Sequence, residues 1–224
     1  MTLYIVGTPI GNLGDITMRA LEVLRSTSIV LVEKWKDSAK LLHHFDIRPT
    51  QILTYHDRNF QIMIPRVLEL LQTTNVALIT SAGMPGVSDP GAQLISACRA
   101  KEIPVIPIPG PSALATAIAM SGLIGQFLFI GFLPKKERAC SKIFDECHAS
   151  GHHLVYFESP YRLQKSKKFL DQRYPRAHVF VGKEMTKMFE RYVAGTPGDI
   201  LRFIAEVAQF KKGEFTIIIQ FPIS

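Results

Sequence analysis

Short apolar runs alternate with longer mixed segments through the first half of the chain. Each run has four or five residues rich in Val, Ile and Leu, which is typical of strands buried on both faces of a parallel sheet. The segments between them are long enough for a crossover helix, so the pattern predicts βαβ units. The expected strands of this half are Leu3–Val6, Ile29–Val32, Gln51–Tyr55, Val76–Ile79 and Val105–Ile108.

Two helices are expected directly after glycine-bearing loops. Asp15 is a suitable N-cap for a helix over Ile16–Arg25, where the spacing of the apolar residues gives a stripe along one face. Ser112 similarly opens an alanine-rich helix that runs to Met120.

The pattern changes after Ser121-Gly122, because several apolar runs now follow one another without room for a helix. Val179–Val193 is best interpreted as an antiparallel hairpin. We therefore expect an α/β protein with two lobes, a mostly parallel sheet in residues 1–113 and a mixed sheet in residues 114–224. The strands expected in the second lobe are Phe127–Leu133, His153–Phe157, His178–Val181, Phe189–Val193 and Phe215–Phe221.

Composition and charge narrow the class of protein. An apolar content of 47% in 224 residues is enough for more than one core. The net charge of +7 favours an anionic partner such as nucleic acid, although it also serves solubility alone. No apolar run approaches the roughly 18 residues of a membrane span, so we expect a cytoplasmic protein without a membrane partner. The three cysteines include no C-x-x-C pair, which argues against a disulfide framework or a zinc knuckle.

Three loops rich in glycine and proline follow expected strands of the first lobe, at Gly7–Gly14, Ser81–Gly91 and Pro109–Ala113. In an open α/β sheet, ligands bind beyond the carboxyl ends of the strands, where such loops gather. Glycine allows close approach of the backbone to a ligand, and proline fixes the loop in advance. The first loop matches neither G-x-G-x-x-G nor a P-loop, so a phosphate cradle is poorly supported. One such loop alone is better explained as an ordinary turn, but three of them in one lobe favour a binding site.

Motifs along nearly the whole chain carry a resemblance to a known family. They are Leu3–Thr17, Tyr55-His56, Gly86–Gly91, Ile108–Ala113, Phe127–Pro134, Glu158–Arg162, Lys183–Lys187 and Lys212–Phe215. In this order they resemble the tetrapyrrole methylase superfamily of class III methyltransferases. Within it, the subfamily that 2'-O-methylates a cytidine of small-subunit ribosomal RNA is the most similar.

The resemblance implies a two-lobed fold that binds S-adenosyl-L-methionine in a cleft between the lobes, without a metal. It also implies a homodimer that acts on ribosomal RNA or the small ribosomal subunit. A sulfonium cofactor is cationic and partly apolar, so carbonyls and apolar walls suit it better than phosphate-binding amides. By position in the family's motifs, the cofactor-binding residues are Pro9, Ser81, Gly83, Met84, Ser112, Ala113 and Phe157.

Methylation of a ribose hydroxyl calls for a base that takes its proton. The motif Lys183–Lys187 offers Glu184 or Lys187. If this motif continues a strand, Lys183 and Met185 face away from Glu184, so only one set addresses the site.

Substrate contacts are expected from Asn12, Trp35 and Arg162. Trp35 lies between two lysines and offers a stacking plane for a base, the alternative being a partly buried tryptophan. Arg162 is suited to a phosphate, and is otherwise an ordinary surface arginine.

Departures from the subfamily's pattern leave alternatives open. Thr80–Pro85 lacks the carboxylate and the threonine that the subfamily has there, and Glu33–Lys36 replaces Glu-Asp-Thr-Arg. Ser224 comes just after the last expected strand, which suggests a shortened paralogue. The alternatives are a methyltransferase for a small molecule such as a tetrapyrrole, and a degenerate member that binds RNA without catalysis.

Overall fold

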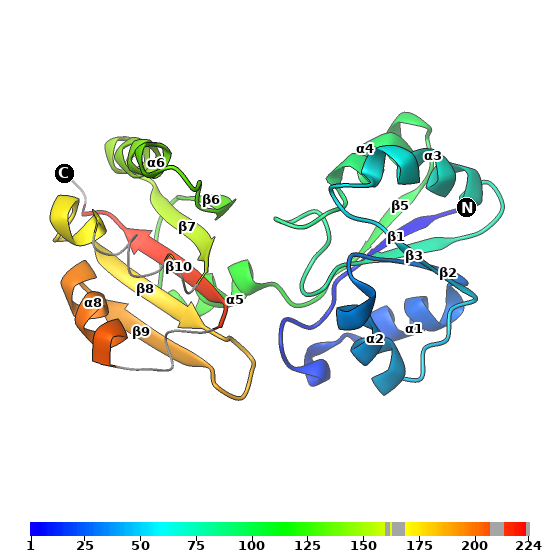
Figure 1. Ribbon diagram of the computed structural model, residues 1–224, viewed down its shortest axis with the longest axis horizontal. Coiled ribbons are helices and arrows are strands. Elements are labelled where there is room, and N and C mark those ends of the chain that lie inside the picture. The colour runs from blue at the N-terminus through cyan, green and yellow to red at the C-terminus, as the bar shows by residue number, and fades with distance from the viewer. Residues whose placement is uncertain (160–161, 163–168, 207–212, 223–224) are drawn as a thin grey trace. The chain divides into compact units, whose positions relative to one another are not determined.

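The computed structural model describes residues 1–159, 162, 169–206 and 213–222. The chain divides into two compact units, Met1–Ser112 and Ala113–Ser224, each built on a five-stranded sheet (Figure 1). One sheet is parallel and the other mixed, as the sequence predicts.

The N-terminal unit contains a sheet in which every strand pair is parallel. The order of its strands is β3-β2-β4-β1-β5. All residues of β2 and β4 are buried, which is why their sequences are apolar throughout rather than alternating. The strands are β1 (Leu3–Val6), β2 (Ile29–Val32), β3 (Gln51–Thr54), β4 (Val76–Ile79) and β5 (Val105–Ile108).

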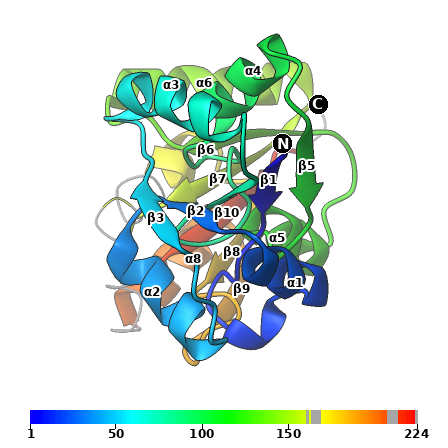
Figure 2. The same ribbon diagram turned by 90° about the vertical axis from the view of Figure 1, so that its right-hand side faces the viewer.

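Helices cover both faces of this sheet (Figure 2). On one face, α1 (Met18–Ser26) and α2 (Trp35–His44) pack through Leu24 and Leu41 against Val6, Val30 and Val32. On the other, α3 (Phe60–Leu70) and α4 (Ala92–Ala100) pack through Val67 and Leu94 against Leu3, Ile5 and Leu31. The two cores hold the sheet between them and fix the positions of its strand ends.

The start of α1 differs from the prediction. Asp15 ends a short 3-10 helix, Leu13–Asp15, and Ile16 is extended. The N-cap is Thr17, whose hydroxyl accepts a hydrogen bond from the Ala20 amide at 3.1 Å. The prediction of Asp15 was wrong because two capping residues stand two positions apart, and only the backbone at Ile16 decides between them.

The strand order creates a switch point between β1 and β4. These two strands are neighbours in the sheet. From β1 the chain continues through α1, on one face of the sheet, to β2, and from β4 it continues through α4, on the other face, to β5. Loops that diverge in this way leave room for a ligand at the carboxyl ends of the strands.

The C-terminal unit contains a mixed sheet of order β6-β7-β10-β8-β9. β6 and β7 are parallel, and the other pairs are antiparallel. The predicted hairpin is confirmed, although its first strand continues to Lys183 and its second begins at Arg191 instead of Phe189. The strands are β6 (Phe127–Phe132), β7 (His153–Glu158), β8 (His178–Lys183), β9 (Arg191–Gly195) and β10 (Phe215–Gln220).

Helices complete the core of the C-terminal unit. α6 (Glu137–Ser150) and α8 (Pro197–Glu206) contribute Phe144 and Ile200 to one cluster with Tyr156, Val181 and Ile217 of the sheet. α5 (Ala113–Ser121) contacts β10. Within the described part of the chain, every helix is too short or too polar to cross a membrane.

Candidate functional site

The loops after β1 and β4 are hydrogen-bonded to each other. The Thr8 amide donates to the Gly83 carbonyl at 2.9 Å, and the Gly83 amide donates to the Thr8 carbonyl at 3.0 Å. The Thr8 side chain is buried, and its hydroxyl lies 3.4 Å from the Thr80 and Gly83 carbonyls. Gly83 has a φ of +77°, which favours glycine. The two predicted loops are thus one connected structure at the switch point.

The loop after β5 joins this structure through a close backbone contact. A Cβ on Gly7 would lie 2.8 Å from both Cα and N of Gly110 and 2.5 Å from the Met84 sulfur. A Cβ on Gly110 would lie 2.9 Å from the Gly7 backbone. Glycine is needed at both positions because the strand ends touch. Gly7, Gly83, Met84 and Gly110 therefore come together, as the sequence predicts for these loops.

Glu33 brings a carboxylate to the same strand ends. It follows β2, and its Oε2 accepts hydrogen bonds from the Ser81 hydroxyl at 2.8 Å and from the Ser81 amide at 3.3 Å. Lys34 lies 3.7 Å from the other oxygen. The carboxylate beside Ser81 thus comes from Glu33, at the end of β2, which lies next to β4 in the sheet.

The remaining predicted residues of this unit are placed as follows. Pro9 is buried beside Thr8, and Ser112 is the last residue of the unit. The Asn12 side chain accepts a hydrogen bond from the Gly14 amide at 3.0 Å, so it caps the short helix. Trp35 begins α2 and is 46% exposed, which makes it an accessible ring rather than a core residue.

Glu184 and Lys187 lie together in the C-terminal unit, in the turn after β8. Lys187 Nζ is 3.0 Å from Glu184 Oε1 and 2.8 Å from Glu214 Oε2. Glu184 Oε1 also accepts from the Glu214 amide at 2.8 Å. The three side chains form one cluster, which we call the Glu184 cluster.

The backbone of this turn is strained. Glu184 and Thr186 have φ values of +49° and +67°, which non-glycine residues rarely adopt. The strand therefore ends at Lys183 and the chain turns. Lys183 and Met185 are nevertheless buried while Glu184 is partly exposed, which agrees with the separation that the sequence predicts. The Thr186 hydroxyl is buried and finds no hydrogen-bond partner among the residues described. Strain and unsatisfied polar groups of this kind are concentrated at functional sites.

The cluster fixes the charges of both residues at neutral pH. Burial raises the pKa of Glu184, but the Glu214 amide and the Lys187 ammonium group lower it by more, so its pKa lies below the usual 4.5. Burial lowers the pKa of Lys187, but Glu214 and Glu184 raise it by more, so its pKa lies above 10.5. Glu184 is thus an ionised proton acceptor, and Lys187 is a cation.

These shifts predict how stability depends on pH. The lowered pKa of Glu184 contributes stability above pH 4.5 that is lost as the pH falls through the folded-state pKa. The raised pKa of Lys187 contributes stability below pH 10.5, and this stability is lost as the pH rises through the folded-state pKa of Lys187. The free-energy difference between wild type and Lys187→Met in urea unfolding should be largest between these limits. Lys142→Met, which breaks an exposed pair with Glu146, should cost less at every pH, and the reverse ranking would contradict the prediction.

Arg162 and Phe157 have local contacts in the C-terminal unit. The Arg162 guanidinium donates to the Leu133 and Pro134 carbonyls at 2.8 and 2.6 Å, and it lies 3.7 Å from Glu158. This side chain anchors the segment after β6, so a phosphate would have to share it. Phe157 packs against Phe129 and Phe132 of β6, and Ala113 is the first residue of α5.

Comparison with known proteins connects these features to a family. The sequence profile of the tetrapyrrole (corrin/porphyrin) methylases matches residues 2–201. The chain belongs to the tetrapyrrole methylase family. It is accordingly an S-adenosylmethionine-dependent methyltransferase.

Relatives within this family are similar over nearly the whole chain. A protein of Halalkalibacterium halodurans is 37% identical over 98% of this chain and 75% of its own length. A protein of Vibrio cholerae is 40% identical over 97% of this chain and 76% of its own length. A protein of Hydrogenobaculum sp. is 36% identical over 98% of this chain and 95% of its own length. All three are named ribosomal RNA small subunit methyltransferase I. The crystal structure of a diphthine synthase shares the fold, with a TM-score of 0.76 and 15% identity over 98% of this chain and 90% of that one.

The strand ends of this methylase fit the cofactor of the family. The groups gathered there are backbone carbonyls, glycines, the Met84 side chain and the Glu33 carboxylate. Apart from Lys34, which lies 3.7 Å from Glu33 Oε1, this set is acidic or neutral, and such groups suit a cationic sulfonium nucleoside. Among the described residues, no three His, Cys, Asp or Glu side chains lie close enough together to hold a metal ion.

The sequence did not single out Glu33, Thr8 and Glu214, which the structure brings into contact with the predicted residues. Glu33 could have been found, because it directly follows an expected strand and so lies at the edge of the sheet where ligands bind. The importance of Thr8 and Glu214 comes from contacts with residues far away in the chain, at separations of 75 and 30. No local pattern indicates such contacts.

Glu33→Gln is expected to weaken the binding of S-adenosylmethionine about fivefold. The substitution keeps an acceptor for Ser81 but removes the charge, and a neutral acceptor is worth on the order of 1 kcal/mol less than a charged one. Calorimetry measures the affinity. Asp37→Asn, which removes an acid from the exposed first turn of α2, is the control. Equal affinities of Glu33→Gln and wild type would contradict this role.

Proposed function

We propose that this methylase transfers a methyl group from S-adenosylmethionine to a ribose 2'-hydroxyl of small-subunit ribosomal RNA, a cytidine in the first instance. The observation that carries the proposal is the similarity to ribosomal RNA small subunit methyltransferases I, at 36–40% identity over 97–98% of the chain. The net charge of +7 supports it, because a basic protein is attracted to RNA phosphates.

The proposed cofactor site is the connected loop structure at the ends of β1, β4 and β5. Pro9, Ser81, Gly83, Met84 and Ser112 would hold the cofactor from the N-terminal unit, with Glu33 held by Ser81. Ala113 and Phe157 are proposed to contribute from the C-terminal unit. S-adenosylmethionine, when bound, supplies a methyl group on a positively charged sulfur.

The proposed base is Glu184. Of the two candidates only Glu184 is a carboxylate, which is ionised at neutral pH, whereas the contacts of Lys187 raise its pKa and keep it protonated. Glu184 would take the proton that the ribose hydroxyl loses as its oxygen gains the methyl group. Lys187, which stays charged, would stabilise the developing negative oxygen or hold the adjacent phosphate.

Labelled S-adenosylmethionine and undermethylated small ribosomal subunits test the proposal. We expect label in the ribosomal RNA and, after digestion to nucleosides, in a 2'-O-methylated nucleoside. Label in a base would contradict methylation of the ribose. Absence of label from the RNA would contradict RNA as the substrate. Glu184→Gln is the matched control, since it should bind the cofactor without transferring the methyl group.

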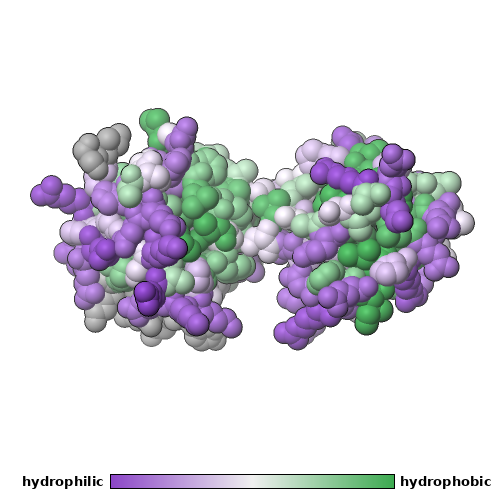
Figure 3. All heavy atoms as spheres, turned by 90° about the horizontal axis from the view of Figure 1, so that it is seen from above, coloured by the Kyte–Doolittle hydropathy of each residue, from purple (hydrophilic) through white to green (hydrophobic). Residues whose placement is uncertain are grey.

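A homodimer is proposed as the working assembly. β6 is an edge strand of the mixed sheet, and its Phe127, Leu128 and Phe132 are 41%, 46% and 60% exposed. Figure 3 shows a continuous apolar area on the C-terminal unit. An exposed edge strand with apolar side chains favours contact with another chain. The molecular mass from sedimentation should be twice that of one chain, and Phe132→Glu should reduce it to the mass of one chain. A monomeric wild-type protein would contradict the proposed homodimer.

A further inference from the structure

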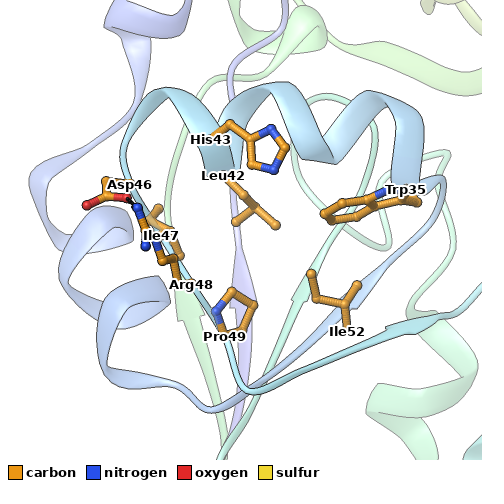
Figure 4. Close-up of a pocket in the computed structure, with 8 residues that line it drawn as sticks. All are labelled: Trp35, Leu42, His43, Asp46, Ile47, Arg48, Pro49 and Ile52. Atoms are coloured by element: carbon orange, nitrogen blue, oxygen red, sulfur yellow. Dashed lines mark hydrogen bonds and ion pairs between the residues drawn. The ribbon is translucent and has the colours of Figure 1, made fainter.

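A pocket of about 430 Å³ lies beside α2 in the N-terminal unit (Figure 4). Its walls come from α2, from the loop that follows the helix and from β3, the edge strand of the sheet. Leu42, Ile47 and Ile52 supply apolar surface, and Leu42 and Ile47 are buried. The volume falls within the range of roughly 300–1,000 Å³ typical of small-ligand sites.

An aromatic wall borders the pocket. Trp35 is held edge-on to His43, with ring centroids 6.0 Å apart and planes at 84°. This contact orients the indole, although nearly half of Trp35 is exposed. Pro49 stands across the hollow from the ring (Figure 4). A flat, oriented and accessible ring opposite a small apolar residue is suited to a planar aromatic ligand.

Basic residues lie beside this wall. Arg48 lines the pocket, and its Nε and Nη2 lie 2.8 Å from Asp46 Oδ1. One edge of the guanidinium is thereby fixed, while the opposite edge carries further N–H donors. Lys34 and Lys36 flank Trp35 and are exposed. From Glu33 to Arg48 the chain has four basic residues and three acidic ones. Lys34 and Arg48 are paired with Glu33 and Asp46, so the net positive charge near the pocket is small.

We infer that this pocket binds one unpaired nucleotide of a single-stranded RNA segment, with its base stacked on Trp35 and its phosphate at Arg48. Stacking is available only to a base that has left a helix, and an arginine edge pairs well with phosphate. The inference rests on the proposed function for the choice of RNA. Trp35 is two residues from Glu33, so the same turn after β2 would connect this nucleotide to the loops proposed to hold the cofactor.

The fluorescence of Trp35 tests the inference directly, because the chain contains one tryptophan. The probe is a single-stranded RNA hexamer, whose binding is followed independently by the anisotropy of an end label. We expect quenching that saturates along the same curve as the anisotropy. A blunt RNA duplex of equal length presents phosphates without unstacked bases and should quench little.

Variants separate stacking from charge. Trp35→Ala should weaken hexamer binding about 5- to 150-fold, the effect of one stacked base, and Trp35→Phe should restore part of it. Arg48→Ala should weaken binding more than Lys101→Ala, which removes an exposed charge at the end of α4. Melting temperatures of the variants show whether each is folded.

Three results would overturn the inference: no hexamer binding, binding that leaves Trp35 fluorescence unchanged, or wild-type affinity in Trp35→Ala. None of these depends on methyl transfer. Failure of the proposed function is seen separately, as wild-type protein that leaves small ribosomal subunits unlabelled.

Discussion

Gly7→Ala is expected to lower the melting temperature by about 2–12 °C and to abolish measurable binding of S-adenosylmethionine. The added Cβ would lie 2.8 Å from the Gly110 backbone and 2.5 Å from the Met84 sulfur. A side chain can turn away, but two backbone segments at strand ends cannot. Overpacking of this kind costs about 1–3 kcal/mol, which corresponds to that temperature shift for a chain of this size. Calorimetry and thermal unfolding measure the two effects.

Gly14→Ala is the matched control for Gly7→Ala. It lies in the same glycine-rich loop, but its Cβ would meet only the Asn12 side-chain oxygen, at 3.2 Å. Neither Gly7 nor Gly14 has a positive φ, so the comparison isolates the close approach of the strand ends. If Gly7→Ala bound the cofactor like wild type, the loops after β1, β4 and β5 would not be the binding structure.

Glu184→Gln is expected to lower kcat for methyl transfer about 10²- to 10⁴-fold, the usual contribution of a positioned base. Glutamine keeps an oxygen for the Glu214 amide, which lies 2.8 Å from Glu184 Oε1. It cannot accept the proton. The affinity for S-adenosylmethionine should remain that of wild type, because Glu184 is not one of the residues proposed to bind the cofactor. Single-turnover transfer to small ribosomal subunits measures the rate.

Glu214→Gln distinguishes proton acceptance from charge. Glu214 contacts the same ammonium group, at 2.8 Å, but its side chain is 79% exposed. Its substitution should change kcat by no more than about threefold, as for an exposed ion pair. A loss equal to that in Glu184→Gln would mean that the cluster acts through its total charge and would remove Glu184 as the base.

The elements of the N-terminal unit were predictable because burial on both faces leaves a continuous apolar signal. β2 and β4 have no exposed residue, and their boundaries match the sequence prediction. The helix cap was predicted at Asp15 and is Thr17, since both residue types cap well and the choice depends on backbone angles. Two left-handed residues turn the chain after Lys183, which no sequence pattern indicated, but Lys183 and Met185 are buried and Glu184 is partly exposed, as predicted.

The loops of the proposed site were predictable where one stretch of sequence carries the signal, and the contacts between strands from distant parts of the chain were not. Gly7, Gly83 and Gly110 lie in loops that are visibly rich in glycine. The contact of Glu33 with Ser81 spans 48 positions and exists because β2 lies next to β4. Only the strand order brings this carboxylate to Ser81. The pocket beside α2 similarly needs Ile52 of β3 next to Trp35.

The central claim is that the glycine-rich strand ends of the N-terminal unit hold a sulfonium nucleoside. Calorimetric titration of the wild-type protein with S-adenosylmethionine, in parallel with Gly110→Ala, tests it most directly. We predict saturable binding to the wild type and none to the variant, in which a Cβ would lie 2.9 Å from the Gly7 backbone. Absence of binding to the wild type, or equal binding to both proteins, would contradict the claim.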